Sequence, residues 1–234
     1  MPARRCWGVI PAAGIGSRMG GDTPKQYLQV AGATVLEHSL GALLECAEIA
    51  AVVVALHPED SRPAHMACFE DERVIIAPGG AERSDSVLAG LEALAGRAGD
   101  SDWVLVHDAA RPCIRGEDIR RLMAEVNARN CGGILAQPVN DTVKRARDDR
   151  TVEATLDRSR LWRAQTPQMF PLGLLRDALA QARERGGAVT DEASAMEMAG
   201  HPVLLVPGSP GNLKITLPAD LPLAAWYLGH PEGV

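Results

Sequence analysis

Short apolar segments alternate with segments of helical period along the first 136 residues, and this alternation restricts the possible folds more than any other feature. The apolar segments predict strands at residues 5–11, 49–56, 73–77, 103–107 and 132–136. Apolar residues at helical spacing predict helices between them, at residues 35–47, 87–95 and 116–128. This order predicts an α/β fold, a Rossmann-like three-layer sandwich with a mostly parallel sheet between two layers of helices.

The pattern changes after Val139, where polar segments replace the buried ones. Alternating residues at 142–147 and 151–157 predict two strands of a β-hairpin that turns at Asp148-Asp149-Arg150. A polar two-stranded hairpin is marginally stable alone, so we expect it to pack on another surface, for which a partner subunit is a natural candidate. The remaining elements are predicted as helices at 171–184 and 190–199, strands at 203–206 and 213–216, and a helix from Pro218. We therefore predict one domain, residues 1–234, with a β-arm at residues 139–164.

Charge and composition exclude several classes of partner. The net charge of −6 disfavours general nucleic-acid binding, because a basic surface supplies most of the affinity for nucleic acid. No stretch approaches the 18 or so unbroken apolar residues of a membrane span, so we expect no membrane partner. Arg4 and Arg5 lead directly into a short strand without the apolar segment of a signal peptide, and we expect a cytoplasmic protein. The five cysteines are scattered, and their spacing predicts neither a zinc site nor a disulfide framework.

A small-residue loop follows the first strand and carries the strongest functional signal. Gly14 and Gly16 can adopt positive φ and let the backbone approach a ligand closely, so that amide groups reach phosphate oxygens. Arg18 and Lys25 then supply positive charge within eleven residues of Gly14. The loop therefore predicts a site for a nucleoside triphosphate, although an ordinary glycine turn also explains the glycine pair taken alone.

The spacing of this loop excludes the two commoner nucleotide-binding motifs. No Walker A run of glycine, four residues and Gly-Lys-Ser/Thr occurs. A dinucleotide fingerprint fits only if Met19 takes the place of its third glycine, and no acidic residue closes a strand about 20 residues later. A dinucleotide-dependent oxidoreductase is therefore disfavoured.

Three loops are predicted to meet at one edge of the sheet. Gly14 follows the first strand, Gly79 and Gly80 follow the third, and Asp108 and Arg111 follow the fourth. In open α/β sheets, ligands bind outside the carboxyl ends of the strands. The sequence thus predicts a single crevice to which all three loops contribute.

Motifs spread along nearly the whole chain resemble those of the 2-C-methyl-D-erythritol 4-phosphate cytidylyltransferase family. The matching blocks occur in the family's order. They are Pro11-Ala12-Ala13-Gly14-x-Gly16-x-Arg18-Met19, Pro24-Lys25-Gln26-Tyr27, Gly79-Gly80-x-x-Arg83-x-x-Ser86-Val87, Val106-His107-Asp108-Ala109-Ala110-Arg111-Pro112, Asp141-Thr142-Val143-Lys144, Gln165-Thr166-Pro167-Gln168, Thr190-Asp191-Glu192-Ala193 and Asn212-Leu213-Lys214-Ile215-Thr216.

The resemblance implies a fold of the nucleotide-diphospho-sugar transferase type and a defined reaction. A cytidylyl group passes from CTP to a polyol phosphate, 2-C-methyl-D-erythritol 4-phosphate, and pyrophosphate is released in non-mevalonate isoprenoid synthesis. In-line attack on the α-phosphate concentrates negative charge on several oxygens, so positioning and electrostatic stabilisation suffice without a covalent nucleophile.

The resemblance also implies roles for individual residues. Three cations act at the triphosphate and are the catalytic candidates: Arg18, Lys25 and Lys214. CTP is bound by Ala12, Ala13, Gly14, Gly16, Gly79, Gly80, Ser86 and Asp108. Asp108 also helps to hold Mg²⁺, a hard ion that prefers oxygen ligands. The polyol phosphate is bound by Arg111, Thr142, Arg158, Thr166 and Thr190. The family's hairpin arm clasps a second subunit, which implies a homodimer in which Arg158 completes the neighbour's site.

The sequence leaves two alternative functions open. Ribitol 5-phosphate cytidylyltransferase shares the glycine loop and the Asp108 block, and a non-catalytic nucleotide sensor could keep the same fold. Ser86 and Thr190 are also typical of helix N-caps, Asp108 of a turn, and Thr142 and Thr166 of strands.

Overall fold

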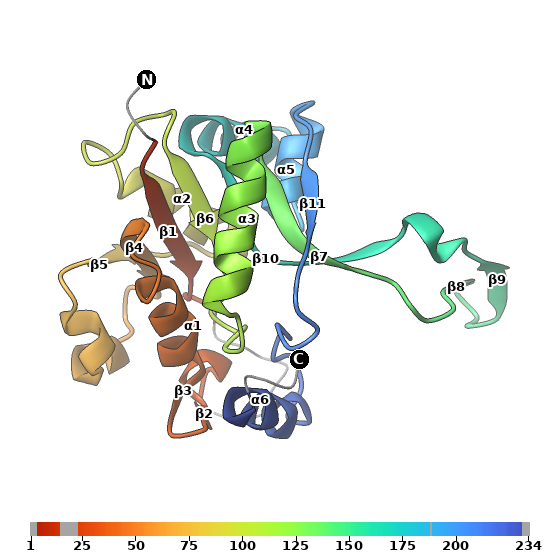
Figure 1. Ribbon diagram of the computed structural model, residues 1–234, viewed down its shortest axis with the longest axis horizontal. Coiled ribbons are helices and arrows are strands. Elements are labelled where there is room, and N and C mark those ends of the chain that lie inside the picture. The colour runs from red at the N-terminus through yellow and green to blue at the C-terminus, as the bar shows by residue number, and fades with distance from the viewer. Residues whose placement is uncertain (1–3, 15–22, 188, 231–234) are drawn as a thin grey trace.

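A seven-stranded sheet forms the centre of the computed structural model, which describes residues 4–14, 23–187 and 189–230 (Figure 1). The strand order is β11-β7-β10-β6-β1-β4-β5. All neighbours pair in parallel except β10, which is antiparallel to both β6 and β7. The strands are β1 (Cys6–Pro11), β4 (Ile49–Leu56), β5 (Val74–Pro78), β6 (Trp103–Val106), β7 (Gly133–Pro138), β10 (Trp162–Pro171) and β11 (Leu204–Pro207). The predicted mostly parallel α/β fold is confirmed.

Helices cover both faces of this sheet, and two buried clusters mark the two faces. One cluster joins α1 (Val35–Leu44) and α3 (Gly116–Arg129) to the sheet, and the other joins α2 (Arg83–Glu92), α4 (Leu172–Glu184) and α5 (Glu192–Met198). Within β4, Val52 and Val54 belong to the first cluster and Val53 to the second. Because both faces are buried, the inner strands β1, β4 and β6 are apolar at every position, which is why they stood out in the sequence.

The long strand β10 was not predicted from the sequence. Its middle carries Gln165, Thr166, Pro167 and Gln168, which lack the alternation of a half-buried strand. The register to β7 shifts between Ala164 and Gln168, so the proline lies at an irregularity, where the missing N–H disturbs the ladder least. Tertiary pairing with β6 and β7 therefore overrides the local sequence signal.

The strand predicted at residues 213–216 is wrong. This segment pairs with no strand. Its Ile215 N–H donates a hydrogen bond of 2.8 Å to Ala110 O, in the loop after β6. The Ile215 side chain instead packs in a third cluster with Val30 and with Ala224 of α6 (Asp220–Gly229). That cluster also holds the short ribbon of β2 (Gln29–Val30) and β3 (Ala33–Thr34), which the sequence had not indicated.

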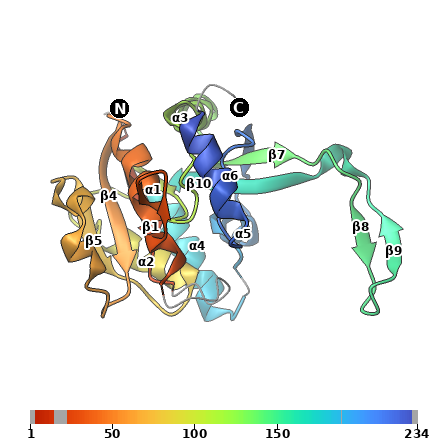
Figure 2. The ribbon, with the colours of Figure 1, turned by 90° about the horizontal axis from the view of Figure 1, so that it is seen from below.

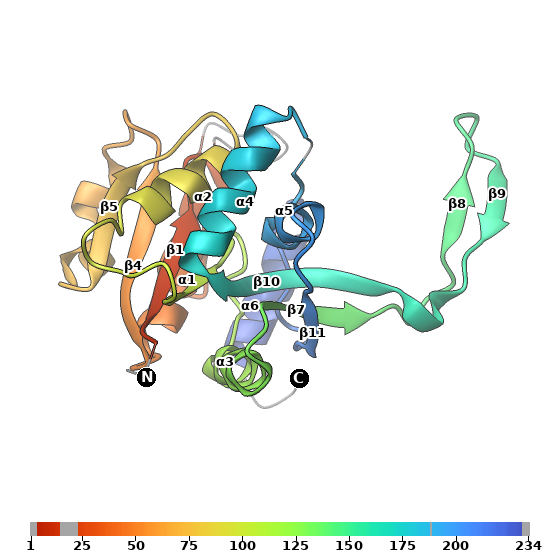
Figure 3. The same cartoon turned by 90° about the horizontal axis from the view of Figure 1, so that it is seen from above.

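The predicted hairpin is confirmed and projects far from the sheet (Figures 2 and 3). Its strands β8 (Lys144–Ala146) and β9 (Val152–Thr155) pair with each other in an antiparallel ribbon. Figure 3 shows that β7 and β10 lead the chain out to this arm and back. All three residues of β8 are exposed, and Arg145 pairs with Glu153 across the ribbon at 2.6 Å. The arm has no apolar core of its own. Among the described residues, no helix has the length and apolarity to span a membrane.

Candidate active site

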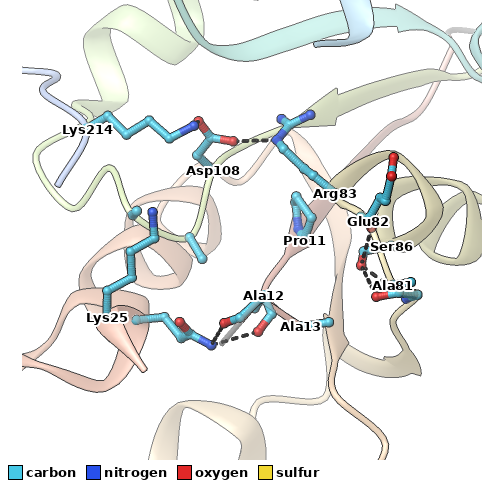
Figure 4. Close-up of a pocket in the computed structure, with 15 residues that line it drawn as sticks. Pro11, Ala12, Ala13, Lys25, Ala81, Glu82, Arg83, Ser86, Asp108 and Lys214 are labelled. Atoms are coloured by element: carbon cyan, nitrogen blue, oxygen red, sulfur yellow. Dashed lines mark hydrogen bonds and ion pairs between the residues drawn. The ribbon is translucent and has the colours of Figure 1, made fainter. Parts of the chain in front are cut away.

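A cavity of about 170 Å³ lies where the loops after β1, β5 and β6 meet (Figure 4). The first loop contributes Ala12, Ala13 and Gly14, the second Gly80 and the third Asp108. The convergence predicted from the sequence is thus confirmed, because the carboxyl ends of parallel strands face one edge of the sheet. Lys25, Ser86 and Lys214 complete the set of candidate residues on the cavity wall.

Gln26 fixes the first of these loops. Its side chain is buried, and its Nε2 donates hydrogen bonds of 2.9 Å to both Ala12 O and Gly14 O. Both carbonyls are therefore held in place by one side chain. Gly14 lies outside the left-handed region, and a Cβ there would meet nothing within 4 Å. The expected positive φ is not used at this glycine, whereas Gly16 and Arg18 lie outside the described residues.

The second loop is held by Ser86, in the first turn of α2. Its hydroxyl accepts a hydrogen bond from Gly80 N–H at 3.1 Å and donates one to Glu82 O at 3.1 Å. Glu82, not Ser86, is the N-cap of the helix. Gly79 lies behind the cavity wall, where its N–H donates to Leu56 O at 2.7 Å. The hydroxyl of Ser86 is therefore engaged in shaping the loop that lines the cavity.

Asp108 is the electrostatic centre of the site. Its carboxylate contacts Arg83 Nε at 2.8 Å, Lys214 Nζ at 2.9 Å and Arg111 Nε at 3.4 Å. Figure 4 shows Arg83 and Lys214 approaching it from opposite sides. Burial opposes the charge of Asp108, but Arg83, Lys214 and Arg111 hold the pKa of this carboxyl well below its usual range. Asp108 is therefore ionised at neutral pH.

A second carboxylate, Glu192, lies behind Arg83. It is completely buried, and its two oxygens accept hydrogen bonds from Arg83 Nη1 at 2.6 Å and Nη2 at 3.0 Å. Burial opposes the charge of Arg83, yet Glu192 and Asp108 together hold the pKa of the guanidinium above its usual value. Arg83 and Glu192 both lie within the sequence motifs, but the sequence indicated a role for neither, and Gln26 was overlooked in the same way.

A second hollow, of about 180 Å³, adjoins the first and brings together three of the predicted acceptor residues. Arg111, Thr166 and Thr190 line it, and it shares Asp108 and Lys214 with the first cavity. Thr166 accepts a hydrogen bond from Asp108 N–H at 3.0 Å, so it fixes the loop as well as facing the hollow. The N-cap of α5 is Asp191, which leaves the Thr190 side chain outside the capping role. Ligands bound in the two hollows would therefore meet at Asp108 and Lys214.

His107 supports the loop from below. It is fully buried, with Nε2 3.1 Å from Arg111 O and Nδ1 3.0 Å from Thr166 Oγ1. Burial lowers its pKa to about 4, so the ring is neutral at physiological pH. His107 therefore holds the Arg111 carbonyl and the Thr166 hydroxyl in place through hydrogen bonds.

Two predicted acceptor residues lie away from both hollows. Thr142 and Arg158 are exposed residues of the arm, and Arg158 donates a hydrogen bond to the neighbouring carbonyl of Asn140. The single chain does not bring them to the cavity. They can join a site only if the arm reaches another molecule.

The acidic residues of the site fit a metal ion shared with phosphates. The described part of the chain has no group of three or more His, Cys, Asp or Glu side chains that could hold a metal ion. Mg²⁺ is typically held by one or two carboxylates together with substrate phosphates, and Asp108 is the carboxylate among the described residues that lines both hollows. Within the described residues, the site therefore offers Asp108, where the two hollows meet, for an ion shared with phosphates and no protein cage for a resident metal.

Comparison with known proteins identifies the family. The family model described as "IspD: 2-C-methyl-D-erythritol 4-phosphate cytidylyltransferase" matches residues 7–230. The chain belongs to this cytidylyltransferase family. The cytidylyltransferase of Photorhabdus laumondii is 50% identical over 228 residues, which cover 95% of this chain and 94% of the relative. That of Serratia proteamaculans is 51% identical over 221 residues, 94% of this chain and 92% of the relative.

The solved structures agree with this assignment to the cytidylyltransferase family. A crystal structure of a 4-diphosphocytidyl-2C-methyl-D-erythritol synthase superposes with a TM-score of 0.84 at 40% identity, covering 97% of this chain and 100% of the other. The fold is therefore the Rossmann-like nucleotidyltransferase fold that the sequence predicted.

Proposed function

We propose that this protein transfers the cytidylyl group of CTP to 2-C-methyl-D-erythritol 4-phosphate and releases pyrophosphate, in the non-mevalonate synthesis of isoprenoid precursors. Membership of the cytidylyltransferase family, matched over residues 7–230, is the observation that carries this proposal. The site geometry supports it, because two adjoining hollows share Asp108 and Lys214, as a transfer between two bound phosphates requires.

The proposed mechanism follows from the charges at the junction of the hollows. A phosphate oxygen of the acceptor attacks the α-phosphorus of CTP in line, the bond to the bridging oxygen breaks, and pyrophosphate leaves with the electron pair. Negative charge grows on the α-phosphate oxygens, where Lys214, Lys25 and Arg18 would stabilise it. Lys25 and Lys214 both line the nucleotide cavity, and Lys25 Nζ contacts Ile215 O, next to Lys214, at 3.4 Å.

The remaining CTP contacts would come from the cavity wall. Ala12, Ala13 and Gly80 line the cavity and carry little or no side chain, so a ligand could approach their backbone closely. Arg111, Thr166 and Thr190 would bind the acceptor in the second hollow, where guanidinium and hydroxyl groups suit a ligand made of hydroxyls and a phosphate.

Mg²⁺ is part of the proposal. When bound, it would neutralise charge on the triphosphate. Asp108 would hold it together with phosphate oxygens, and the carboxylate is kept ionised for that purpose by its cationic neighbours.

We also propose a cytoplasmic homodimer joined through the β-arm. The arm has no core of its own, and its exposed residues Thr142 and Arg158 lie away from the hollows of their own chain. In a dimer they would complete the acceptor site of the other subunit. Arg158→Ala mixed with Thr190→Ala should then regain activity, since hybrid dimers contain one intact site. Absence of any recovery at full mixing would refute the shared site.

The direct test is pyrophosphate release with Mg²⁺ and CTP, using 2-C-methyl-D-erythritol 4-phosphate and ribitol 5-phosphate as alternative acceptors. ATP, GTP and UTP serve as nucleotide controls. Selective turnover of CTP with the methylerythritol phosphate supports the proposal. Turnover with ribitol phosphate alone refutes methylerythritol phosphate as the acceptor. No turnover with either acceptor refutes cytidylyl transfer. In the same assay, Lys214→Ala should lose turnover. Arg129→Ala, which removes an exposed cation of α3, is its matched control and should not.

A further inference from the structure

Arg83 occupies a position that a cation would not favour without help. It is the first residue of α2, where the positive end of the helix dipole repels a cation. It also lines both hollows of the site. The guanidinium therefore depends on its two carboxylate partners, Asp108 and Glu192.

Glu192 is well suited to anchor it. It is the first residue of α5, where the helix dipole favours an anion, and its side chain is completely buried. The pair is bidentate, with both oxygens of Glu192 engaged by the two terminal nitrogens of Arg83. This geometry leaves Nε of Arg83 to contact Asp108. A bidentate pair fixes orientation as well as position.

Glu192 lines neither hollow, so it cannot act on a ligand directly. We propose that Glu192 is a positioning residue of the transferase site: it locks Arg83, which in turn fixes one oxygen of Asp108 and leaves Lys214 as the cation that turns to the phosphates. The inference rests on the proposed function. Lys214 suits this role because its side chain is 38% exposed and contacts Asp108 through one nitrogen.

The charges predict how the site responds when the anchor is neutralised. Arg83, Arg111 and Lys214 face Asp108 and Glu192, which leaves one net positive charge in the cluster. Glu192→Gln raises that charge, so affinity for the triphosphate is kept or increased. Arg83 loses its fixed orientation, however, so the arrangement that favours the transition state is lost.

The test compares kcat and KM. For Glu192→Gln we expect kcat to fall about 10- to 100-fold, the usual effect of misplacing a group by about 1 Å, while KM for CTP stays equal or falls. Glu192→Asp keeps the charge on a shorter side chain and should retain more turnover than Glu192→Gln. Glu197→Gln is the matched control, the same substitution at an exposed position of the same helix, and should leave kcat unchanged. A raised KM with unchanged kcat would overturn the proposal.

A double-mutant cycle separates positioning from general packing. If Glu192 acts through Arg83, Glu192→Gln adds no further loss of kcat in an Arg83→Met background. The double variant should also melt at a higher temperature than Arg83→Met, in which Glu192 is buried without a partner. A further loss of kcat in the double variant would show that Glu192 acts independently of Arg83, and would overturn the inference.

A readout independent of turnover keeps this inference distinct from the proposed function. The side-chain Nε–H signal of Arg83 in an NMR spectrum, assigned by its disappearance in Arg83→Lys, reports the contact with Asp108. We expect the signal to shift or broaden in Glu192→Gln and to be unchanged in Glu197→Gln. An unchanged signal in Glu192→Gln refutes the positioning role. This readout depends neither on which acceptor the protein uses nor on whether Arg83→Met folds.

Discussion

Substitution of Gly79 offers a sharp test of how the nucleotide cavity is built. This glycine does not adopt a left-handed conformation, so its φ does not require glycine. Space is what it lacks, because an added Cβ would lie well under 3.0 Å from the Cβ of Ala13, 3.0 Å from Ser86 Oγ and 3.2 Å from Leu56 O. Ala13 and Ser86 are both wall residues of the cavity.

The magnitude follows from these separations. Carbon atoms in contact lie about 3.5–4.0 Å apart, so Gly79→Ala must push the first and second loops apart by roughly 1 Å or more. Such overpacking costs about 1–3 kcal/mol of unfolding free energy. A displacement of about 1 Å at a reacting site can cost about 100-fold in rate, so kcat/KM for CTP should fall by one to two orders of magnitude.

The assay pairs urea unfolding with steady-state pyrophosphate release. Gly41→Ala is the matched control, since its Cβ would meet nothing within 4 Å inside α1. That variant should gain about 0.5–1 kcal/mol from helix propensity and keep its activity. If Gly79→Ala unfolds at the same urea concentration as the unmodified protein with unchanged kcat/KM, the close approach of the two loops does not shape the site.

Three further outcomes are expected. Lys214→Ala should lower kcat about 100- to 1,000-fold, because it removes a contact to the transition state. Urea unfolding should change little, because the Lys214 side chain is partly exposed. Unchanged turnover would remove Lys214 from the mechanism. Gln26→Leu leaves the carbonyls of Ala12 and Gly14 without their donor, and should cost about 1–3 kcal/mol of unfolding free energy and raise KM for CTP; a variant as stable as the original protein would contradict the clamp. The pKa of His107 is depressed to about 4, so the unfolded chain takes up a proton first as pH falls. The free energy of unfolding therefore falls between about pH 6.5 and 4, by about 2 kcal/mol from pH 7 to pH 5. Urea titrations of His107→Gln at pH 7 and pH 5 should lack this part of the pH dependence.

The elements that the sequence predicted well are those whose local pattern and tertiary role agree. The apolar run of β4 and the helical spacing of Leu36, Leu40 and Leu43 in α1 both match their buried positions. Where the two disagree, the prediction failed. β10 is polar in its middle yet central in the sheet, and residues 213–216 alternate like a strand yet have no strand beside them.

The candidate site divides in the same way. Residues whose place in the site is set by the loop that carries them, such as Gly80, were located by short sequence motifs. Residues that act through a distant partner were given no role, since nothing near Arg83 in the sequence indicates Glu192, 109 positions away. Thr142 and Arg158 show a third case, because the structure of one chain leaves them outside the hollows.

By itself, the sequence determined which segments are buried on both faces, and hence the layered sheet whose strand ends gather the three loops. Hydrophobic period and glycine spacing are local properties that can be read along the chain. Only the tertiary structure decided the pairing of charges around Asp108, with Arg83 held between it and Glu192. The reason is physical: an ion pair depends on distance and burial, and neither is set until the helices that carry its members have packed on the sheet.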